Sequence, residues 1–342
     1  MPERVLVVAP AWVGDMVMSS PLLQMIRQRH QDAEIHVLAP EWTRPLLQRM
    51  PEVTHIHAMP LGHGRLGLVQ RWKLGSALRS LKFTRAIVLP NSWKSALVPW
   101  AAQIPKRTGW RGEWRYGLLN DIRRLRPEQW PRMVDRFVAL GSDMWNQGED
   151  IPLPRLVCDR IDVYRACERH QLNQSLPVVA LCPGAEFGPS KQWPVSSYAK
   201  LAQACLSAGT QVWIFGSEKD RDTGNRICAE LSDQNGHVFN LAGMTKLEEA
   251  VDLLTIPKVV VSNDSGLMHV AAAVAPSRAL VALYGSTSMT FTPPLAPAAT
   301  MLSHPQPCSP CFRRSCPLGH HACMVGLDVA RVWSVVMQAL TQ

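Results

Sequence analysis

Short apolar runs rich in β-branched residues alternate with stretches of helical periodicity along almost the whole chain. The apolar runs predict strands over residues 4–8, 34–38, 53–57 and 85–89, and later over 178–181, 211–215, 238–241, 258–262 and 279–283. The helical pattern covers residues 21–29, 44–50 and 68–81, and later 197–208, 223–231, 245–254 and 267–274. Regular alternation of strand and helix is typical of parallel sheets with helices on both faces.

The length of the chain indicates two such units. It has 342 residues, about twice the size of an average domain. We expect an α/β protein in which two Rossmann-like, doubly wound domains face each other across a cleft. Polar residues and prolines interrupt the pattern near the middle, so the expected first domain spans residues 1–155, followed by a linker helix over 156–176. The second domain then covers 177–327, and the final helix, 328–342, is expected to pack back on the first domain.

The chain shows neither a membrane span nor a signal peptide. No apolar run approaches the roughly 18 residues needed to cross a bilayer. The N-terminal stretch starts with charged residues before a strand-like run and has no small-residue cleavage site. A soluble, cytoplasmic protein is therefore expected.

Positive charge is concentrated in the first part of the chain. The net charge is +9, and no acidic residue occurs between Glu52 and Glu113, an interval that holds ten basic ones. Nine of the twelve tryptophans also precede residue 150. A basic, tryptophan-rich region favours a polyanionic partner, which could be nucleic acid, an anionic membrane face, or a phosphorylated lipid or sugar.

Four of the nine cysteines form a cluster, Cys308, Cys311, Cys316 and Cys323, with His320 and His321 inside it. Such spacing suggests a structural metal. The intervals do not match a two-plus-two zinc module, however, and packed thiols or an opportunistic disulfide explain the cluster better. A metal bound by the cluster stays the less favoured alternative.

Two motifs that resemble known ligand sites are poor candidates. The stretch Gly62 to Gly67 fits GxGxxG, but it lacks the acidic residue about 20 positions later that would hold a ribose. Asp220-Arg221-Asp222 fits the DxD motif of metal-dependent sugar transferases. It lies where a helix is expected to begin, and acidic residues at that position are explained by the helix dipole.

Three strand-to-helix turns are better candidates for chemistry. Asp15 follows the first strand, where open α/β sheets bind ligands, although an N-cap for the first helix is by itself the more common use of such an aspartate. In the second part, residues 181–194 present Lys191 after a strand, and residues 263–273 open a helix after another. The backbone N–H groups of Ser265, Gly266 and Leu267, with Lys191 and His269 as further donors, suit a diphosphate. A capped helix with a core histidine is the alternative.

These three turns carry a resemblance to a known family. The segments NDSGLMHVAAA, CPGAEFGPSKQWP and PAWVGDM closely resemble the ADP-heptose:lipopolysaccharide heptosyltransferases of glycosyltransferase family 9, which have the GT-B fold. In the first part, MPLGHGRLG, LPNSWKSALVPW and RTGWRGEWRYGLLND are similar to the members that add the second heptose of the inner core. The resemblance covers nearly the full length.

The resemblance implies an inverting transfer of heptose from ADP-heptose that needs no metal and no cofactor. By this resemblance, Asp15 is the general base, and the donor diphosphate is held by Lys191, Asp264, Ser265, Gly266, Leu267 and His269. Lys191 and His269 would neutralise the charge that develops on ADP. More loosely, Glu218 would hold the ribose and Met244 would cover the adenine.

The same resemblance makes the first domain the acceptor-binding one and the second the ADP-sugar-binding one. Its acceptor would be phosphorylated Kdo₂-lipid A that already carries one heptose, in a Gram-negative cell. The enzyme would then lie at the cytoplasmic face of the inner membrane, in peripheral contact with it, and would not bind nucleic acid.

Three other functions compete with this interpretation. Another core heptosyltransferase, such as the one that adds the first heptose, would share the same site residues. A nucleotide-sugar epimerase of the GT-B fold would convert its substrate with no acceptor present. A basic nucleic-acid-binding protein would show salt-dependent affinity for DNA or RNA, but the chain has no recognisable nucleic-acid module.

Overall fold

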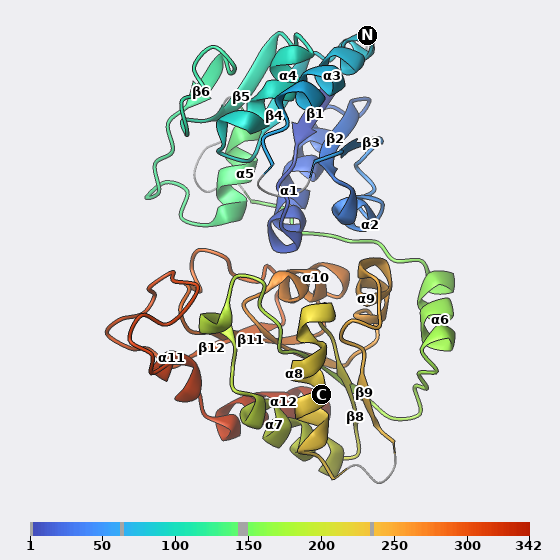
Figure 1. Cartoon of the computed structure of the whole chain (residues 1–342). Helices are drawn as coiled ribbons and strands as arrows, with labels where there is room; N and C mark the ends of the chain where they lie inside the picture. Colours follow the sequence, from blue (N-terminus) through green and yellow to red (C-terminus); the bar gives the residue numbers. More distant parts are fainter. Residues whose placement is uncertain (1–2, 62–64, 143–149, 233–235) are drawn as a thin grey trace. The chain divides into compact units, whose positions relative to one another are not determined.

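The chain folds into two compact α/β units, Met1–Arg155 and Leu156–Gln342, in a computed structural model (Figure 1). The structure describes residues 3–61, 65–142, 150–232 and 236–342. Each unit contains a six-stranded, fully parallel sheet, which confirms the predicted fold class. No helix among the described residues is long and apolar enough to cross a bilayer.

The sheet of the first unit has the strand order β3-β2-β1-β4-β5-β6. Its strands are β1 Arg4–Val8, β2 Glu34–Pro40, β3 His55–Met59, β4 Arg85–Val88, β5 Lys106–Trp110 and β6 Asp121–Arg123. The helices of this unit are α1 Val13–Arg29, α2 Arg44–Leu47, α3 Leu68–Leu78, α4 Leu97–Ala101 and α5 Met133–Gly141. The direction of winding reverses between β1 and β4, and such a switch point is where sheets of this class bind ligands.

Helices cover both faces of this first sheet. On one face α1 packs against α5, and on the other α3 packs against α4. Leu6, Val8 and Val88 from the central strands are buried against Leu78 and Phe83 on the α3 side. The two central strands are therefore apolar on both faces, as expected for a parallel sheet.

The sheet of the second unit has the order β12-β11-β10-β7-β8-β9, which is the same winding with its switch point between β7 and β10. Its strands are β7 Val178–Cys182, β8 Gln211–Ile214, β9 Val238–Asn240, β10 Val259–Asn263, β11 Ala279–Tyr284 and β12 Ala299–Ser303. Its helices are α6 Arg160–Arg169, α7 Val195–Ser207, α8 Arg221–Ala229, α9 Leu247–Leu253, α10 Gly266–Val274, α11 Ala322–Val325 and α12 Val329–Thr341.

The last helix, α12, belongs to the core of the second unit. Val332 and Val336 are fully buried there, in one apolar cluster with side chains of α7 and of the central strands. The structure thus assigns residues 328–342 to the second unit, and the expected packing of this helix on the first domain stays a prediction. An amphipathic helix packs on whichever apolar surface lies within reach, and periodicity does not say which surface that is. The helix expected as a linker, α6, packs on α9 of the same unit.

Candidate functional site

The two candidate turns of the second unit leave adjacent central strands. The lysine loop, residues 183–194, follows β7, and the α10 turn, residues 263–267, ends β10 and begins α10. Because β7 and β10 are parallel neighbours, their carboxyl ends lie at the same edge of the sheet. The topology therefore brings together residues that are about 80 positions apart in the sequence.

Asn263 ties the lysine loop to this edge. Its Oδ1 accepts hydrogen bonds from the Trp193 backbone N–H at 3.2 Å and from the Tyr198 hydroxyl at 3.0 Å. Its Nδ2 donates to the Pro183 carbonyl at 2.6 Å. Asn263 is fully buried, so the loss of these bonds would leave buried polar groups unpaired. In the sequence, Asn263 is one residue of the NDSGLMHVAAA segment, and nothing local marks it as a site residue.

Lys191 and Asp264 form a buried ion pair where the two turns meet. Lys191 Nζ lies 2.6 Å from Asp264 Oδ2 and also donates to the Asp264 carbonyl at 3.3 Å. The side chains are only 13% and 4% exposed. Thr287 adds a hydrogen bond of 2.6 Å from its hydroxyl to Asp264 Oδ2. The Lys191 ammonium also lies 4.9 Å from the centre of the Phe187 ring. An ammonium has three N–H donors, and two of them are used by Asp264.

This pairing changes the interpretation of Asp264. A buried carboxylate that already accepts hydrogen bonds from Lys191 and Thr287 is poorly suited to contact an anionic diphosphate. The geometry favours a positioning role, in which Asp264 holds the Lys191 ammonium at the edge of the sheet. Thr287 is a further member of the site that sequence analysis missed, because nothing in its local sequence points to this contact.

The N-terminus of α10 offers backbone donors beside this pair. Ser265 is the N-cap and makes no side-chain capping bond, while Gly266 and Leu267 form the first turn. N–H groups of the first turn have no partner inside a helix, and the helix dipole makes this end attractive to anions. The structure thus places Ser265, Gly266 and Leu267 at the N-terminus of α10, and their binding of a diphosphate stays a prediction.

His269 is buried in the same helix and is only 4% exposed. Burial lowers its pKa to about 4; Asp264 opposes this shift and Lys191 adds to it. The imidazole is therefore neutral at pH 7. It can donate a hydrogen bond to a diphosphate, and the expectation that His269 helps to neutralise charge on ADP stays a prediction.

Glu218 and Met244 lie together beyond the ends of β8 and β9. Arg221 joins them, with Nη1 at 3.2 Å from Glu218 Oε1 and Nη2 at 3.2 Å from Met244 Sδ. Gly243 has a φ of +68°, and a Cβ atom there would collide with the Glu218 carboxylate. A glycine is therefore required for this close approach. Met244 is 57% exposed, as a side chain that covers a flat ligand would be.

Asp220, from the DxD-like motif, serves a turn. Its Oδ2 accepts hydrogen bonds from the Ser217 backbone N–H at 2.8 Å and the Ser217 hydroxyl at 2.7 Å. This capping arrangement supports the structural interpretation of the motif. The glycine-rich stretch of the first unit is only partly visible, since residues 62–64 lie outside the described residues, and Gly67 is the N-cap of α3.

Asp15 lies at the switch point of the first unit. It is half-buried in the first turn of α1, whose N-cap is Trp12. The N-cap interpretation of Asp15 is therefore wrong, and its carboxylate occupies a position where it interacts favourably with the helix dipole. The role of Asp15 as general base stays a prediction.

The loops that follow β4 and β5 are tied together at the same sheet edge of the first unit. Arg115 is 2% exposed and donates from Nη1 to the Pro90 carbonyl at 2.7 Å. Glu113 Oε2 accepts a hydrogen bond from the Trp93 backbone N–H at 3.1 Å. Burial lowers the pKa of the Arg115 guanidinium. Arg115 thus links the segments LPNSWKSALVPW and RTGWRGEWRYGLLND, a contact that neither segment reveals by itself.

The four clustered cysteines line one small pocket, together with Ser190 and Ser286. All nine cysteines lie in the described part of the chain and are free thiols. The Cys316 sulfur accepts hydrogen bonds from backbone N–H groups of residues 318–321, foremost that of His321, and these lower its pKa. Burial raises the pKa of Cys323.

This cysteine-rich segment supports the lysine loop. The Ser190 hydroxyl donates to the Arg313 carbonyl, and the Ser190 backbone N–H donates to the Arg314 carbonyl. A Cβ at Gly188, whose φ is +151°, would collide with the Arg314 carbonyl. The segment therefore positions the residues that precede Lys191, whether or not its thiols bind anything.

Comparisons with known proteins show the family of this chain. The family model described as glycosyltransferase family 9 (heptosyltransferase) matches residues 71–322. Lipopolysaccharide heptosyltransferase 2 of Escherichia coli K12 is 50% identical over 307 residues, which cover 87% of each chain. Lipooligosaccharide heptosyltransferase 2 of Haemophilus influenzae is 46% identical and covers 87% of this chain and 88% of its own. The solved structure of E. coli ADP-heptose lps heptosyltransferase II superposes with a TM-score of 0.87 at 44% identity, and the match covers 99% of each chain.

Proposed function

The chain belongs to glycosyltransferase family 9, and from that premise we propose that it transfers heptose from ADP-heptose to the first heptose of a lipopolysaccharide inner core. The observation that carries this proposal is the Lys191–Asp264 pair beside the N-terminus of α10. A fixed ammonium and a row of backbone N–H groups are what a diphosphate leaving group requires. The name of the 50% identical E. coli relative, lipopolysaccharide heptosyltransferase 2, supports the same sugar and the same acceptor class.

On this proposal, the donor binds at the carboxyl edge of the second sheet. Lys191 and the N–H groups of Gly266 and Leu267 bind the diphosphate, and neutral His269 donates one further hydrogen bond. Glu218 would accept hydrogen bonds from the ribose hydroxyls, and Met244 would cover the adenine. Their mutual contacts through Arg221 support one continuous adenosine site.

The transfer would be a single displacement that inverts the anomeric carbon. The acceptor hydroxyl oxygen forms a bond to that carbon as the bond to the ADP phosphate oxygen breaks, and the electron pair leaves with ADP. The Asp15 carboxylate takes the hydroxyl proton. Lys191 and the α10 N-terminus stabilise the new charge on ADP. Because these groups supply the positive charge, we expect no cofactor and no requirement for a divalent metal in this step.

Mass spectrometry with two acceptors tests this function. The purified chain is mixed with ADP-heptose and either Kdo₂-lipid A or the same acceptor that already carries one heptose. We expect a gain of one heptose on the heptosylated acceptor alone. A gain on bare Kdo₂-lipid A would instead make the chain the enzyme for the first heptose. Conversion of ADP-heptose with no acceptor present would indicate an epimerase and contradict the proposal.

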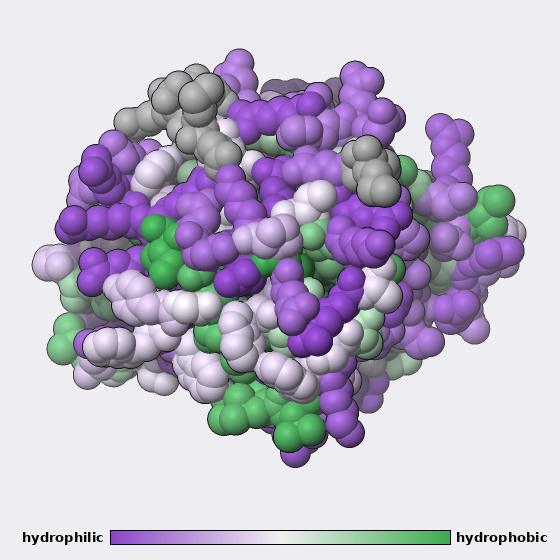
Figure 2. Space-filling model, turned by 90° about the horizontal axis from the view of Figure 1, so that it is seen from above, coloured by the Kyte–Doolittle hydropathy of each residue, from purple (hydrophilic) through white to green (hydrophobic). Residues whose placement is uncertain are grey.

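A lipid-linked acceptor requires the enzyme to work at a membrane, and the first unit offers a surface for this. The α3 patch consists of exposed Leu66, Leu68, Val69, Trp72 and Trp100. Leu68, Val69 and Trp72 line a cavity of about 280 Å³ together with Leu97. Figure 2 shows that the surface seen from above is mostly hydrophilic, with hydrophobic residues gathered in a few patches.

Basic residues lie close in the sequence to the apolar residues of the α3 patch. Arg65, Lys73 and Arg79 are all exposed, and the Arg79 guanidinium lies 5.9 Å from the centre of the Trp72 ring. No acidic residue occurs in the sequence between Glu52 and Glu113 to offset them. A helix with exposed apolar residues flanked by cations suits an anionic lipid surface. We therefore place the chain in peripheral contact with the cytoplasmic face of the inner membrane.

Replacing Val69 by glutamate should weaken binding to vesicles that contain phosphatidylglycerol. The substitution removes an apolar side chain that is 63% exposed and adds a negative charge, worth about 1 kcal/mol near an anionic surface, so the loss should be roughly fivefold or more. Ile161→Glu is the matched control, since Ile161 is 58% exposed on α6 of the second unit. Co-sedimentation measures both variants. If both variants lose vesicle binding equally, the α3 patch is not the membrane-binding surface. The same conclusion follows if the unmodified chain binds vesicles of phosphatidylcholine alone equally well.

A further inference from the structure

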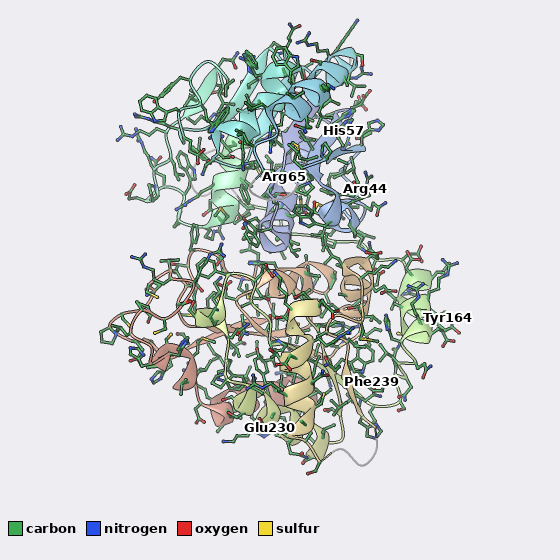
Figure 3. All side chains as sticks on the ribbon, viewed as in Figure 1. Arg44, His57, Arg65, Tyr164, Glu230 and Phe239 are labelled. Atoms are coloured by element: carbon green, nitrogen blue, oxygen red, sulfur yellow. The ribbon has the colours of Figure 1, made fainter. Side chains whose placement is uncertain are left out.

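Three histidines and a glutamate gather at the edge of the first sheet, outside the proposed reaction site. Glu34 and His36 lie on β2, while His55 and His57 lie on the edge strand β3. His36 is in register with His55, so alternate residues of both strands place these side chains on one face. His57 is labelled in Figure 3, where it lies on the β3 side of the unit. The cluster begins at the amino ends of the strands, whereas Asp15 follows the carboxyl end of β1.

The side chains of this cluster are close enough to share one ion. Ligand atoms of Glu34, His36 and His55 all lie within 4.8 Å of one another. His36 Nε2 is 3.5 Å from Glu34 Oε2, and the rings of His36 and His55 have centroids 4.4 Å apart. Within the ranges that the structure describes, this is the one group of three or more potential ligands that meets such a distance. The four clustered cysteines do not form such a group.

The remaining hydrogen bonds orient His36 for a metal. Its Nδ1 lies 2.9 Å from Nε2 of His57, with the two rings stacked at an angle of 7°. If Nδ1–H donates to His57, the lone pair of Nε2 faces Glu34. A metal-binding histidine typically donates its other ring N–H to a neighbour in this way. The Phe83 ring packs edge-on against the His36 ring, with the ring centroids 4.9 Å apart, and so restricts the orientation of the imidazole.

The Glu34 carboxylate forms a salt bridge with Arg4. Arg4 Nε lies 2.8 Å from Glu34 Oε2, and Arg4 Nη2 lies 3.1 Å from Oε1. This pair fixes the carboxylate, although it also places a positive charge near the site. The glutamate side chain is 29% exposed and His55 is exposed. Solvent therefore reaches the cluster and can supply the remaining ligands of an ion.

We propose that Glu34, His36 and His55 form a binding site for a divalent transition metal, with His57 as the residue that positions His36. Two imidazoles and one carboxylate with open positions are a ligand set that suits Zn²⁺, Co²⁺ or Ni²⁺. Imidazole ligands select against Mg²⁺ and Ca²⁺. A metal bound here would link the edge strand β3 to β2. It would lie away from the carboxyl ends of the strands, where the transfer is proposed to occur. The inference is independent of the proposed function.

The site is tested by titrating the tag-free chain with Co²⁺. Calorimetry measures the stoichiometry and the affinity, and the visible spectrum reports the type of ligand. We expect one ion per chain with a spectrum that lacks thiolate-to-cobalt charge transfer. His57→Gln should weaken binding about 10- to 100-fold, the usual effect of losing a residue that orients a metal ligand. His55→Gln removes a ligand itself and should weaken binding more. His55 is exposed, so this variant is expected to fold, and circular dichroism verifies that it does.

His30→Gln is the matched control, because His30 is an exposed histidine of the same unit whose Nδ1 lies 3.3 Å from a single carboxylate, that of Glu3. Its affinity for Co²⁺ should equal that of the unmodified chain. Equal affinity of the His55→Gln chain would overturn the proposal. So would a charge-transfer band that Cys311→Ser abolishes and His55→Gln leaves intact, since that result would assign the ion to the cysteine pocket.

Discussion

Replacing Asp15 by asparagine is expected to slow heptose transfer by roughly 10²–10⁴-fold, the usual contribution of a general base. The amide keeps the size of the side chain but cannot take the proton of the acceptor hydroxyl. ADP-heptose should still bind, because the residues proposed to hold the donor all lie in the second unit. Product mass spectrometry gives the rate, and calorimetry gives the affinity for the donor.

Asp32→Asn is the control for this experiment, since Asp32 is an exposed aspartate of the same unit that follows α1. It removes the same charge and should leave the rate unchanged. An Asp15→Asn chain that loses donor affinity but retains turnover would show that the assignment of the base is wrong. Retained turnover with retained affinity would lead to the same conclusion.

The second large effect is expected at Lys191. Lys191→Met removes a charge-assisted hydrogen bond to the diphosphate, worth about 1.5–3 kcal/mol, so the affinity for ADP should fall about 10- to 100-fold. The same change leaves the Asp264 carboxylate buried without its cation. Breaking a buried pair in this way costs about 3–5 kcal/mol, so the melting temperature should also fall. Calorimetry with ADP and thermal denaturation measure the two effects.

A double variant separates ligand binding from stability. In Lys191→Met/Asp264→Asn the uncompensated buried charge is gone, so part of the stability should return while the affinity for ADP remains low. Lys200→Met is the control, since Lys200 is exposed on α7 and should change neither quantity. If the double variant binds ADP as well as the unmodified chain, Lys191 does not contact the diphosphate.

The strand and helix pattern predicted the class of fold because both sheets are buried and parallel, which produces short apolar runs between amphipathic helices. The bounds were less accurate. The third strand was expected over residues 53–57, but β3 is His55–Met59. It starts where its pairing with β2 begins, at His55 opposite His36, and composition does not reveal that register. The helix expected over 68–81 ends as α3 at Leu78 and continues as a short 3₁₀ turn.

The sequence predicted the candidate donor residues and a role for each, but it did not show how these residues contact one another. The pairing of Lys191 with Asp264 joins residues 73 positions apart, and the contact from Thr287 depends on a third loop. The neutral state of His269 follows from its burial, which a histidine on an apolar helix face suggests but does not establish. Asn263 and Arg115 were missed as individual residues because their partners come from distant segments.

Local patterns in the sequence by themselves determined the alternation of elements, the basic first part and the three turns that follow strands. These features depend on residue type and short-range spacing, which strand pleat and helix pitch translate directly into structure. Only the tertiary structure decided that α12 packs in the second unit, that Asp264 holds Lys191, and that Glu34, His36 and His55 meet across two strands. Those outcomes depend on which surfaces and which distant side chains come together when the sheets form. Long-range packing and burial set them, and no local periodicity records such information.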